Sequence, residues 1–151
     1  MKFFLNKISN HKSIYEIYDE EYPDLTIYGI FQDQYFEKPF SDFQILGLMP
    51  PFGGWLSGVE DELFFCERIL PFSGETRVAP ILIRPDVKDF SCMTIVVLVE
   101  QTDYSFRWKR FGLDRSNLYP YRERLDEAVD WFESDVGLEF SVKEYRDVLG
   151  S

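Results

Sequence analysis

The chain of 151 residues has a formal net charge of −11 and is 45% hydrophobic and 18% aromatic. This length and apolar content fit a single globular domain over residues 1–151, and they exclude a disordered or fibrous chain. The acidity argues against direct binding of nucleic acid, because phosphate groups are bound by clustered Lys and Arg side chains.

The acidic residues are concentrated in the first half of the chain. Residues 1–75 hold 5 Lys and Arg against 13 Asp and Glu, a net charge of −8, whereas residues 76–151 hold 11 against 14, a net charge of −3. This distribution predicts an acidic face built from the first half.

The N-terminus predicts a short strand or an ordered lead-in at residues 2–8. Its apolar run has only three residues, and no segment of the chain approaches 18 consecutive apolar residues. We therefore expect a cytoplasmic protein without a membrane span. Cys66 and Cys92 lie in apolar contexts, which predicts reduced, buried thiols.

The first half of the chain then alternates strand patterns with polar turns. Residues 14–18 and 25–31 are rich in Ile and Tyr and predict a strand pair, joined by a dense acidic turn at 19–24. Residues 43–49 predict another strand. It is followed at 50–58 by a loop in which Pro and Gly surround two aromatic residues.

The middle of the chain continues this strand pattern. Residues 63–70 predict a strand, with a short helix as the alternative. Residues 78–84 predict a further strand, in which Pro80 indicates the start of the strand or an edge position.

Residues 94–114 predict a β-hairpin at the centre of a sheet. The first strand contains a continuous apolar run at 95–99, typical of a strand buried on both faces, and residues 101–103 supply the turn. In the second strand, aromatic side chains alternate with polar ones, as in a half-buried strand. The aromatic set is Tyr104, Phe106 and Trp108, and the polar set is Ser105, Arg107 and Lys109.

The last third of the chain predicts helices. Residues 122–132 place apolar side chains at helical spacing, namely Leu125, Ala128, Val129 and Phe132. Ser141 and Glu144 have the spacing of a capping box, in which the serine hydroxyl accepts a hydrogen bond from the backbone at Glu144 and the Glu144 side chain reaches back to the cap. The apolar face of the helix that follows comprises Val142, Tyr145, Val148 and Leu149, and Gly150 marks its end. Strands followed by helices predict an α+β fold, a mainly antiparallel β-sheet with one or two C-terminal helices packed on it.

The residues that carry most catalytic and metal chemistry are scarce. His11 is the one histidine, and it lies in a polar lead-in. Neither Cys66 nor Cys92 has a nucleophile signature around it, and one His with two separated Cys does not match a zinc site. The glycines at 53–58 do not form a phosphate-binding motif. We expect no catalytic constellation, no metal and no cofactor.

A basic stripe stands out against the acidic background, made of Arg107, Lys109, Arg110 and Arg115. Interleaved with aromatic residues, it resembles a single-strand nucleic-acid platform. The alternation favours a different interpretation, because the aromatic side chains then face the core and the cations face solvent. We expect these cations to pair with neighbouring carboxylates.

The candidate functional feature is therefore a surface that binds a protein. Two acidic clusters, at 19–24 and 60–62, lie next to Tyr18, Tyr22 and Trp55, and carboxylates beside aromatic anchors are typical of protein interfaces. The predicted contact residues are Asp19, Glu20, Glu21, Asp24, Trp55, Glu60, Asp61 and Glu62.

In general character, the chain is similar to the immunity proteins that bacteria pair with secreted toxins. This likeness implies a non-enzymatic inhibitor that occludes the site of a basic protein partner, such as a toxin or nuclease, and acts as a monomer or weak homodimer. The alternative is a structural or assembly subunit of phage or secretion-system type that forms a homo-oligomer. A third hypothesis is a ligand-binding or enzymatic pocket lined by Phe52, Trp55 and Trp108.

Overall fold

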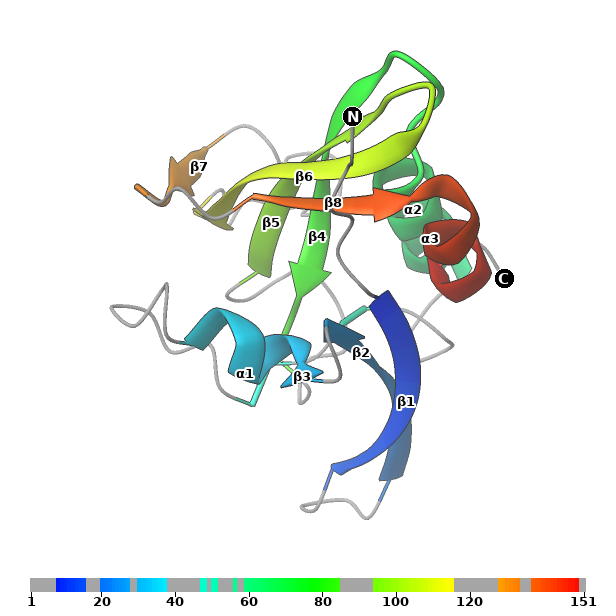
Figure 1. Ribbon diagram of the computed structural model, residues 1–151. Coiled ribbons are helices and arrows are strands. Elements are labelled where there is room, and N and C mark those ends of the chain that lie inside the picture. Colours follow the sequence, from blue (N-terminus) through cyan, green and yellow to red (C-terminus); the bar gives the residue numbers. More distant parts are fainter. Residues whose placement is uncertain are drawn as a thin grey trace.

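The computed structural model builds the described part of the chain into two antiparallel sheets with helices beside them (Figure 1). The described residues are 8–15, 20–27, 30–37, 47–48, 50–51, 56, 59–84, 94–115, 128–133 and 137–149.

The larger sheet has five strands and is centred on the predicted hairpin. Its strands are β4 (Thr76–Leu82), β5 (Thr94–Gln101), β6 (Ser105–Asp114), β7 (Val129–Trp131) and β8 (Leu138–Ser141). Strand β5 lies between β4 and β6, and β7 and β8 follow one another along the other edge of β6. With helix α3 packed against this antiparallel sheet, the predicted α+β class is confirmed.

Strand β6 shows the predicted alternation at residues 106–109, but the prediction for Ser105 is wrong, because this residue is buried. Phe106 and Trp108 are fully buried, whereas Arg107 and Lys109 are exposed. The prediction for Tyr104 is wrong, because this residue lies in the turn, where 83% of its surface is exposed. In this turn, the backbone N–H of Thr102 donates a hydrogen bond to the carbonyl oxygen of Ser105, with 2.8 Å between N and O.

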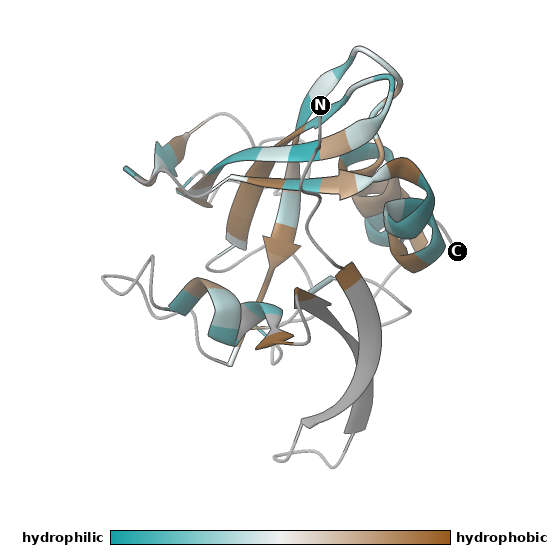
Figure 2. Ribbon diagram, viewed as in Figure 1, coloured by the Kyte–Doolittle hydropathy of each residue, from teal (hydrophilic) through white to brown (hydrophobic). Residues whose placement is uncertain are grey.

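Strand β4 lies at the end of the strand order among the described strands, as Pro80 predicts. The pairing of β4 with β5 shifts in register between Pro80 and Leu82, since proline has no N–H to donate to the ladder. Figure 2 shows hydrophobic colour over the last part of β4 and along much of β5, the part of the sheet that is buried.

The N-terminal part forms a smaller, three-stranded sheet. Strands β1 (Ile8–Tyr15) and β2 (Glu20–Ile27) pair in antiparallel orientation, and β3 (Ile30–Phe31) pairs with β2. A strand pair is present in this region, but the predicted bounds of 14–18 and 25–31 are wrong, because β1 and β2 each begin earlier and residues 30–31 form the separate strand β3. Helix α1 (Gln32–Glu37) follows directly. Of the lead-in at 2–8 only Ile8 is described, and of the predicted strand at 43–49 only Gly47 and Leu48 are described.

Helix α2 (Val59–Ile69) replaces the predicted strand at 63–70. Phe65 and Ile69 are buried four residues apart, which is the spacing of a helical face. Three carboxylates in the first turn and Arg68 in the last turn complement the helix dipole. These charges outweigh the β propensity of the aromatic residues, and the alternative of a short helix is correct.

The helix predicted over 122–132 is wrong at its C-terminal end. Residues 129–131 form strand β7, which pairs with residues 112–114 of β6. Gly112 permits this close approach, because a Cβ atom there would lie 2.6 Å from Val129 Cγ1. Pairing with a neighbouring strand therefore prevails over helical periodicity. Residues 122–127 lie outside the described part of the chain.

Helix α3 (Val142–Leu149) begins at the predicted cap. Glu144 N donates to Ser141 Oγ at 3.2 Å, and the predicted apolar face is confirmed, with Tyr145, Val148 and Leu149 buried. The Glu144 carboxylate also accepts a hydrogen bond from the backbone N–H of Ile8 at 2.7 Å, which ties this helix to β1.

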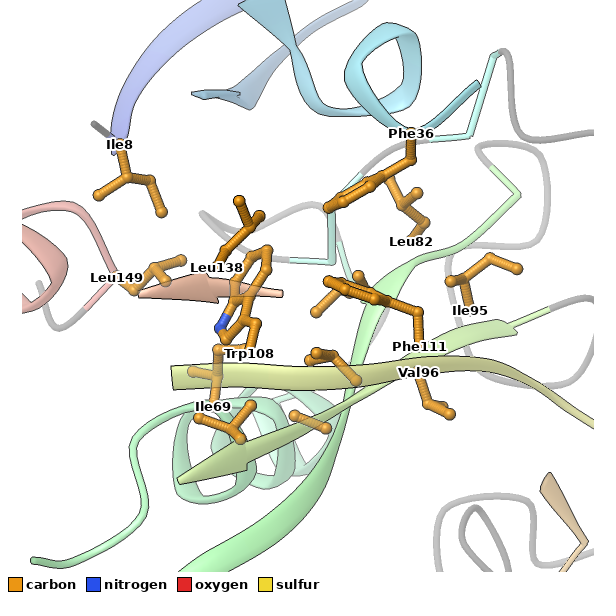
Figure 3. Close-up of a cluster of buried hydrophobic side chains, with 14 of the residues drawn as sticks. Ile8, Phe36, Ile69, Leu82, Ile95, Val96, Trp108, Phe111, Leu138 and Leu149 are labelled. Atoms are coloured by element: carbon orange, nitrogen blue, oxygen red, sulfur yellow. The ribbon is translucent and has the colours of Figure 1, made fainter. Parts of the chain in front are cut away.

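One hydrophobic cluster joins the two sheets and the helices (Figure 3). Ile8 from β1 and Phe36 from α1 meet side chains of the five-stranded sheet, and the Phe36 ring lies 4.8 Å from that of Phe111. Tyr145 connects three elements. Its hydroxyl accepts from Trp108 Nε1 at 3.0 Å and donates to the Ile69 carbonyl oxygen at 2.7 Å. Burial raises the pKa of Tyr145 well above its usual value, so the hydroxyl keeps the proton that it donates.

Candidate partner-binding surface

Helix α2 has one face in the core and another open to solvent. Phe65 and Ile69 are 2% and 1% exposed, and the helix packs beside β4. On another side of the same helix, Val59 and Leu63 expose 71% and 58% of their surface, and Cys66 is exposed as well. The helix therefore leaves apolar side chains outside the core, although Phe65 and Ile69 are buried and Phe64 is partly buried.

Carboxylates border these exposed apolar side chains. At about 100° per residue, Glu60 and Glu67 lie on one side of them and Glu62 lies on the other. The helix holds four acidic residues and one basic residue, a net charge of −3. That one cation, Arg68, lies over the ring of Phe64, 5.0 Å from its centre, and its helical position is on the side opposite Val59.

Two of these carboxylates make no ion pair with a described side chain. Among the described side chains, no Lys, Arg or His lies within 4.0 Å of the carboxylates of Glu62 and Glu67. Their negative potential acts on the thiol between them. Partial burial, followed by the charges of Glu62 and Glu67, raises the pKa of Cys66 above its ordinary value. The predicted burial of this thiol is wrong, because Cys66 lies on the open face of the helix.

The basic residues of β6 are arranged in the opposite way. Arg107 contacts Glu139 at 2.7 Å, and Lys109 contacts Glu100 at 3.6 Å. Beyond the strand, Arg115 pairs with Asp130 at 3.2 Å. The remaining member of the stripe, Arg110, lies over the Trp131 ring at 4.9 Å.

This arrangement confirms the predicted pairing with carboxylates for Arg107, Lys109 and Arg115, whereas Arg110 lies over an aromatic ring instead. Carboxylates and an aromatic ring from neighbouring strands contact the cations. The interleaved Phe106 and Trp108 are buried. The aromatic rings are thus not available for stacking on bases.

The structure places the two predicted acidic clusters on different elements. Glu60, Asp61 and Glu62 form the first turn of α2. The prediction of an acidic turn at 19–24 is wrong, because residues 20–27 are strand β2, where Glu20 pairs with Tyr15 at the far end of the hairpin (Figure 1). Ladder pairing extends through these acidic residues because β1 supplies a partner at each position.

Some predicted contact residues cannot be assigned to a surface. Asp19 and Trp55 lie outside the described residues. Glu21 and Asp24 are described as positions in β2, opposite Ile14 and His11 respectively. His11, predicted to lie in a polar lead-in, is therefore a strand residue.

Sequence reasoning missed two exposed aromatic side chains on adjoining loops. Phe72 follows α2 and is 76% exposed, and Tyr104 in the β5–β6 turn is 83% exposed. Their neighbours connect the loops, since Ser73 Oγ donates to Asp103 Oδ1 at 3.4 Å. Apolar periodicity could not reveal these residues, because each belongs to a turn rather than to a periodic element.

The described residues do not assemble a metal centre, since none of them form a group of three or more His, Cys, Asp and Glu side chains suited to a metal ion. Among the described residues, no helix is long and apolar enough to cross a membrane. Comparisons with protein-family models, curated proteins and solved structures gave no match. The functional argument therefore rests on the surface chemistry of the chain.

Proposed function

We propose that the protein is a non-enzymatic binding protein that neutralises or regulates a basic protein partner by covering the partner's site. One observation supports this function above the others. The cations of β6 are occupied by neighbouring groups, whereas Glu62 and Glu67 on α2 have no described cation and border exposed apolar side chains. The negative electrostatic potential of these α2 carboxylates therefore favours contact with a cationic group of a partner.

The proposed mechanism has an electrostatic step and a contact step. The net charge of −11 attracts a cationic partner and raises the rate of encounter. Apolar side chains such as Val59 and Leu63 then exclude water from the contact, and burial of apolar surface contributes about 25 cal/mol per Å². The predicted residues of the first cluster, Glu20, Glu21 and Asp24, would extend the acidic field along β2.

The test is capture from a native lysate with elution by a salt gradient. We expect a basic protein in near-stoichiometric amount, released at raised salt because screening weakens exposed charge pairs. The triple variant Glu60→Lys/Asp61→Lys/Glu62→Lys should associate at least about tenfold more slowly at low salt, with a flatter salt dependence.

The control for this variant is Glu133→Lys/Asp147→Lys, which introduces positive charge at two exposed acidic positions outside α2. It should keep most of the salt-dependent association. Equal rates for the wild type and the α2 variant would remove this helix from the electrostatic step.

Self-association as an assembly subunit is the second candidate. The exposed aromatic pair Phe72 and Tyr104 supports it, because Phe and Tyr are enriched at interfaces. Light scattering at micromolar concentration distinguishes the two candidates. A stable, salt-insensitive oligomer that is lost in Phe72→Ser/Tyr104→Ser would favour assembly, and a monomer would exclude it.

A further inference from the structure

The exposed apolar residues of α2 have the spacing of a coiled-coil seam. Val59, Leu63 and Cys66 are separated by four and then three residues, and Leu70, directly after the helix, continues the pattern with a partly buried side chain that packs against the core. Alternating steps of four and three define the a and d positions of a heptad, where a second helix packs. In α2, Phe65 and Ile69 are buried in the core and Phe64 packs against it, whereas Val59, Leu63 and Cys66 remain exposed.

The flanking positions of the seam are acidic. With Leu63 at an a position, Glu60 and Glu67 occupy e positions and Glu62 occupies a g position. In a coiled coil, residues at e and g of one helix face those of the other helix and decide which partner is accepted. Glutamates at these positions attract Lys and Arg and repel carboxylates.

We propose that the exposed seam of α2 binds an amphipathic cationic helix, with apolar residues at a and d and Lys or Arg at e and g. This inference rests on the proposed function and names the segment of the basic partner that is recognised. Val59, Leu63 and Cys66 supply the apolar contact, and Glu62 and Glu67 set the charge preference.

A second copy of this chain does not meet that requirement. Pairing of two α2 helices would bring the flanking glutamates of one copy against those of the other, between chains that each carry a net charge of −11. Like charges at facing positions disfavour such pairing. The seam spans the 11 residues of α2, about 16 Å, so the helix of the partner is recognised over one to two heptads.

The test uses two synthetic helical peptides of about three heptads with leucine at a and d. One peptide carries lysine at e and g, and its control carries glutamate at the same positions. Fluorescence anisotropy of the labelled peptides measures binding at low ionic strength. We expect the wild-type protein to bind the lysine peptide at least about tenfold more tightly than the glutamate peptide, a difference of about 1.4 kcal/mol.

A second readout places the peptide on the seam. Cys66 is exposed at a d position, so bound lysine peptide should slow its alkylation by iodoacetamide, measured by peptide-resolved mass spectrometry. The glutamate peptide at the same concentration should leave the rate of alkylation unchanged.

Variants of the seam separate shape from charge. Leu63→Asp should weaken binding of the lysine peptide at least about tenfold, and Tyr104→Asp, at a more exposed position outside α2, should not. Cys66→Arg gives an independent disruption of the same seam. Glu62→Lys/Glu67→Lys should reverse the preference toward the glutamate peptide, while Glu133→Lys/Asp147→Lys should not.

Three outcomes would overturn the proposal that the seam binds a cationic helix. They are absence of binding, equal binding by wild type and Leu63→Asp when circular dichroism shows both to be folded, and binding without protection of Cys66. Each is independent of the capture of a basic protein from lysate. Suppose that the basic protein is captured by Leu63→Asp but not by Glu60→Lys/Asp61→Lys/Glu62→Lys. This result would refute binding through the seam and leave the proposed function standing. Absence of any salt-eluted basic protein would refute the proposed function itself.

Discussion

Strand β6 and helix α2 use the same kinds of residues in opposite ways. On β6, aromatic side chains are buried and cations meet carboxylates of neighbouring strands, as in the contact of Arg107 with Glu139 at 2.7 Å. On α2, apolar Val59 and Leu63 are exposed, and the carboxylates of Glu62 and Glu67 face no described cation. On β6, apolar side chains and charges are buried or paired within the chain. On α2, they are exposed and can contact an external group.

This difference separates a stabilising region from a recognition region. Substitutions on β6 should act on the free energy of unfolding, since its side chains contact several other elements. Substitutions on the open face of α2 should change binding and leave stability nearly unchanged, because those side chains make few contacts that unfolding would break. Paired variants in the two regions test this separation directly.

The largest expected effect is that of Trp108→Ala. Trp108 is fully buried, and its ring packs against Phe140 and Tyr145 at 5.0 and 6.3 Å between ring centres. Truncation leaves a cavity and should lower the free energy of unfolding by about 3–5 kcal/mol. Leu63→Ala on α2 should change it by no more than about 0.5 kcal/mol. Urea denaturation followed by circular dichroism measures both values.

A loss of more than about 2 kcal/mol in Leu63→Ala would contradict the comparison, because that loss requires a buried side chain. Phe106→Ala is the matched control for Trp108→Ala. It removes another fully buried ring of β6, one that stacks on Tyr145 at 4.2 Å between ring centres, and should also destabilise strongly.

A smaller effect is expected for Tyr145→Phe, which removes a single oxygen atom. The change leaves the buried Trp108 Nε1 and the Ile69 carbonyl oxygen without the hydroxyl that pairs them at 3.0 and 2.7 Å. It should cost about 1–3 kcal/mol in the free energy of unfolding. Tyr104→Phe, the same substitution at an 83% exposed position, should be neutral. Equal free energies of unfolding for the wild type, Tyr145→Phe and Tyr104→Phe would show that the hydrogen bonds of Tyr145 add nothing beyond the packing of its ring.

The regions where sequence and structure agree are those with local, self-consistent signals. The alternation in β6 predicts burial of Phe106 and Trp108 because a strand places successive side chains on opposite faces. The cap at Ser141 predicts the start of α3 because its hydroxyl satisfies a backbone N–H that the helix leaves unpaired. Both signals depend only on nearby residues.

The regions where they disagree depend on distant contacts. Residues 129–131 have helical periodicity, yet they form β7 because Gly112 offers a strand edge without a side chain. Phe64 and Phe65 favour a strand by propensity, yet Phe65 and Ile69 are buried at helical spacing in a helix that packs beside β4. In both cases a neighbouring element decides the structure.

The candidate surface is predictable in part for the same reason. The acidity of residues 60–62 is visible in the sequence, but the open seam of α2 depends on which face of the helix is buried. Once Phe65 and Ile69 are placed in the core, the exposure of Val59 and Leu63 follows from helical geometry. The two exposed aromatic residues in turns have no periodic signal and require the structure.

The smallest expected effect concerns the reactivity of Cys66. Burial and the charges of Glu62 and Glu67 raise the pKa of this thiol, so less of the reactive thiolate is present at neutral pH than in an unperturbed cysteine. The rate of Cys66 alkylation should therefore rise at higher pH than the rate for N-acetylcysteine measured in parallel.

Glu62→Gln/Glu67→Gln removes the two charges and should move this curve to lower pH, though not fully, because burial is the larger cause and remains. Glu133→Gln, at an exposed position two residues after β7, should leave the curve in place. A Cys66 curve that coincides with that of N-acetylcysteine, or that does not move in the double variant, would mean that the carboxylates beside the seam are screened. Their contribution to partner choice would then have to come from direct contact rather than from the field of the helix.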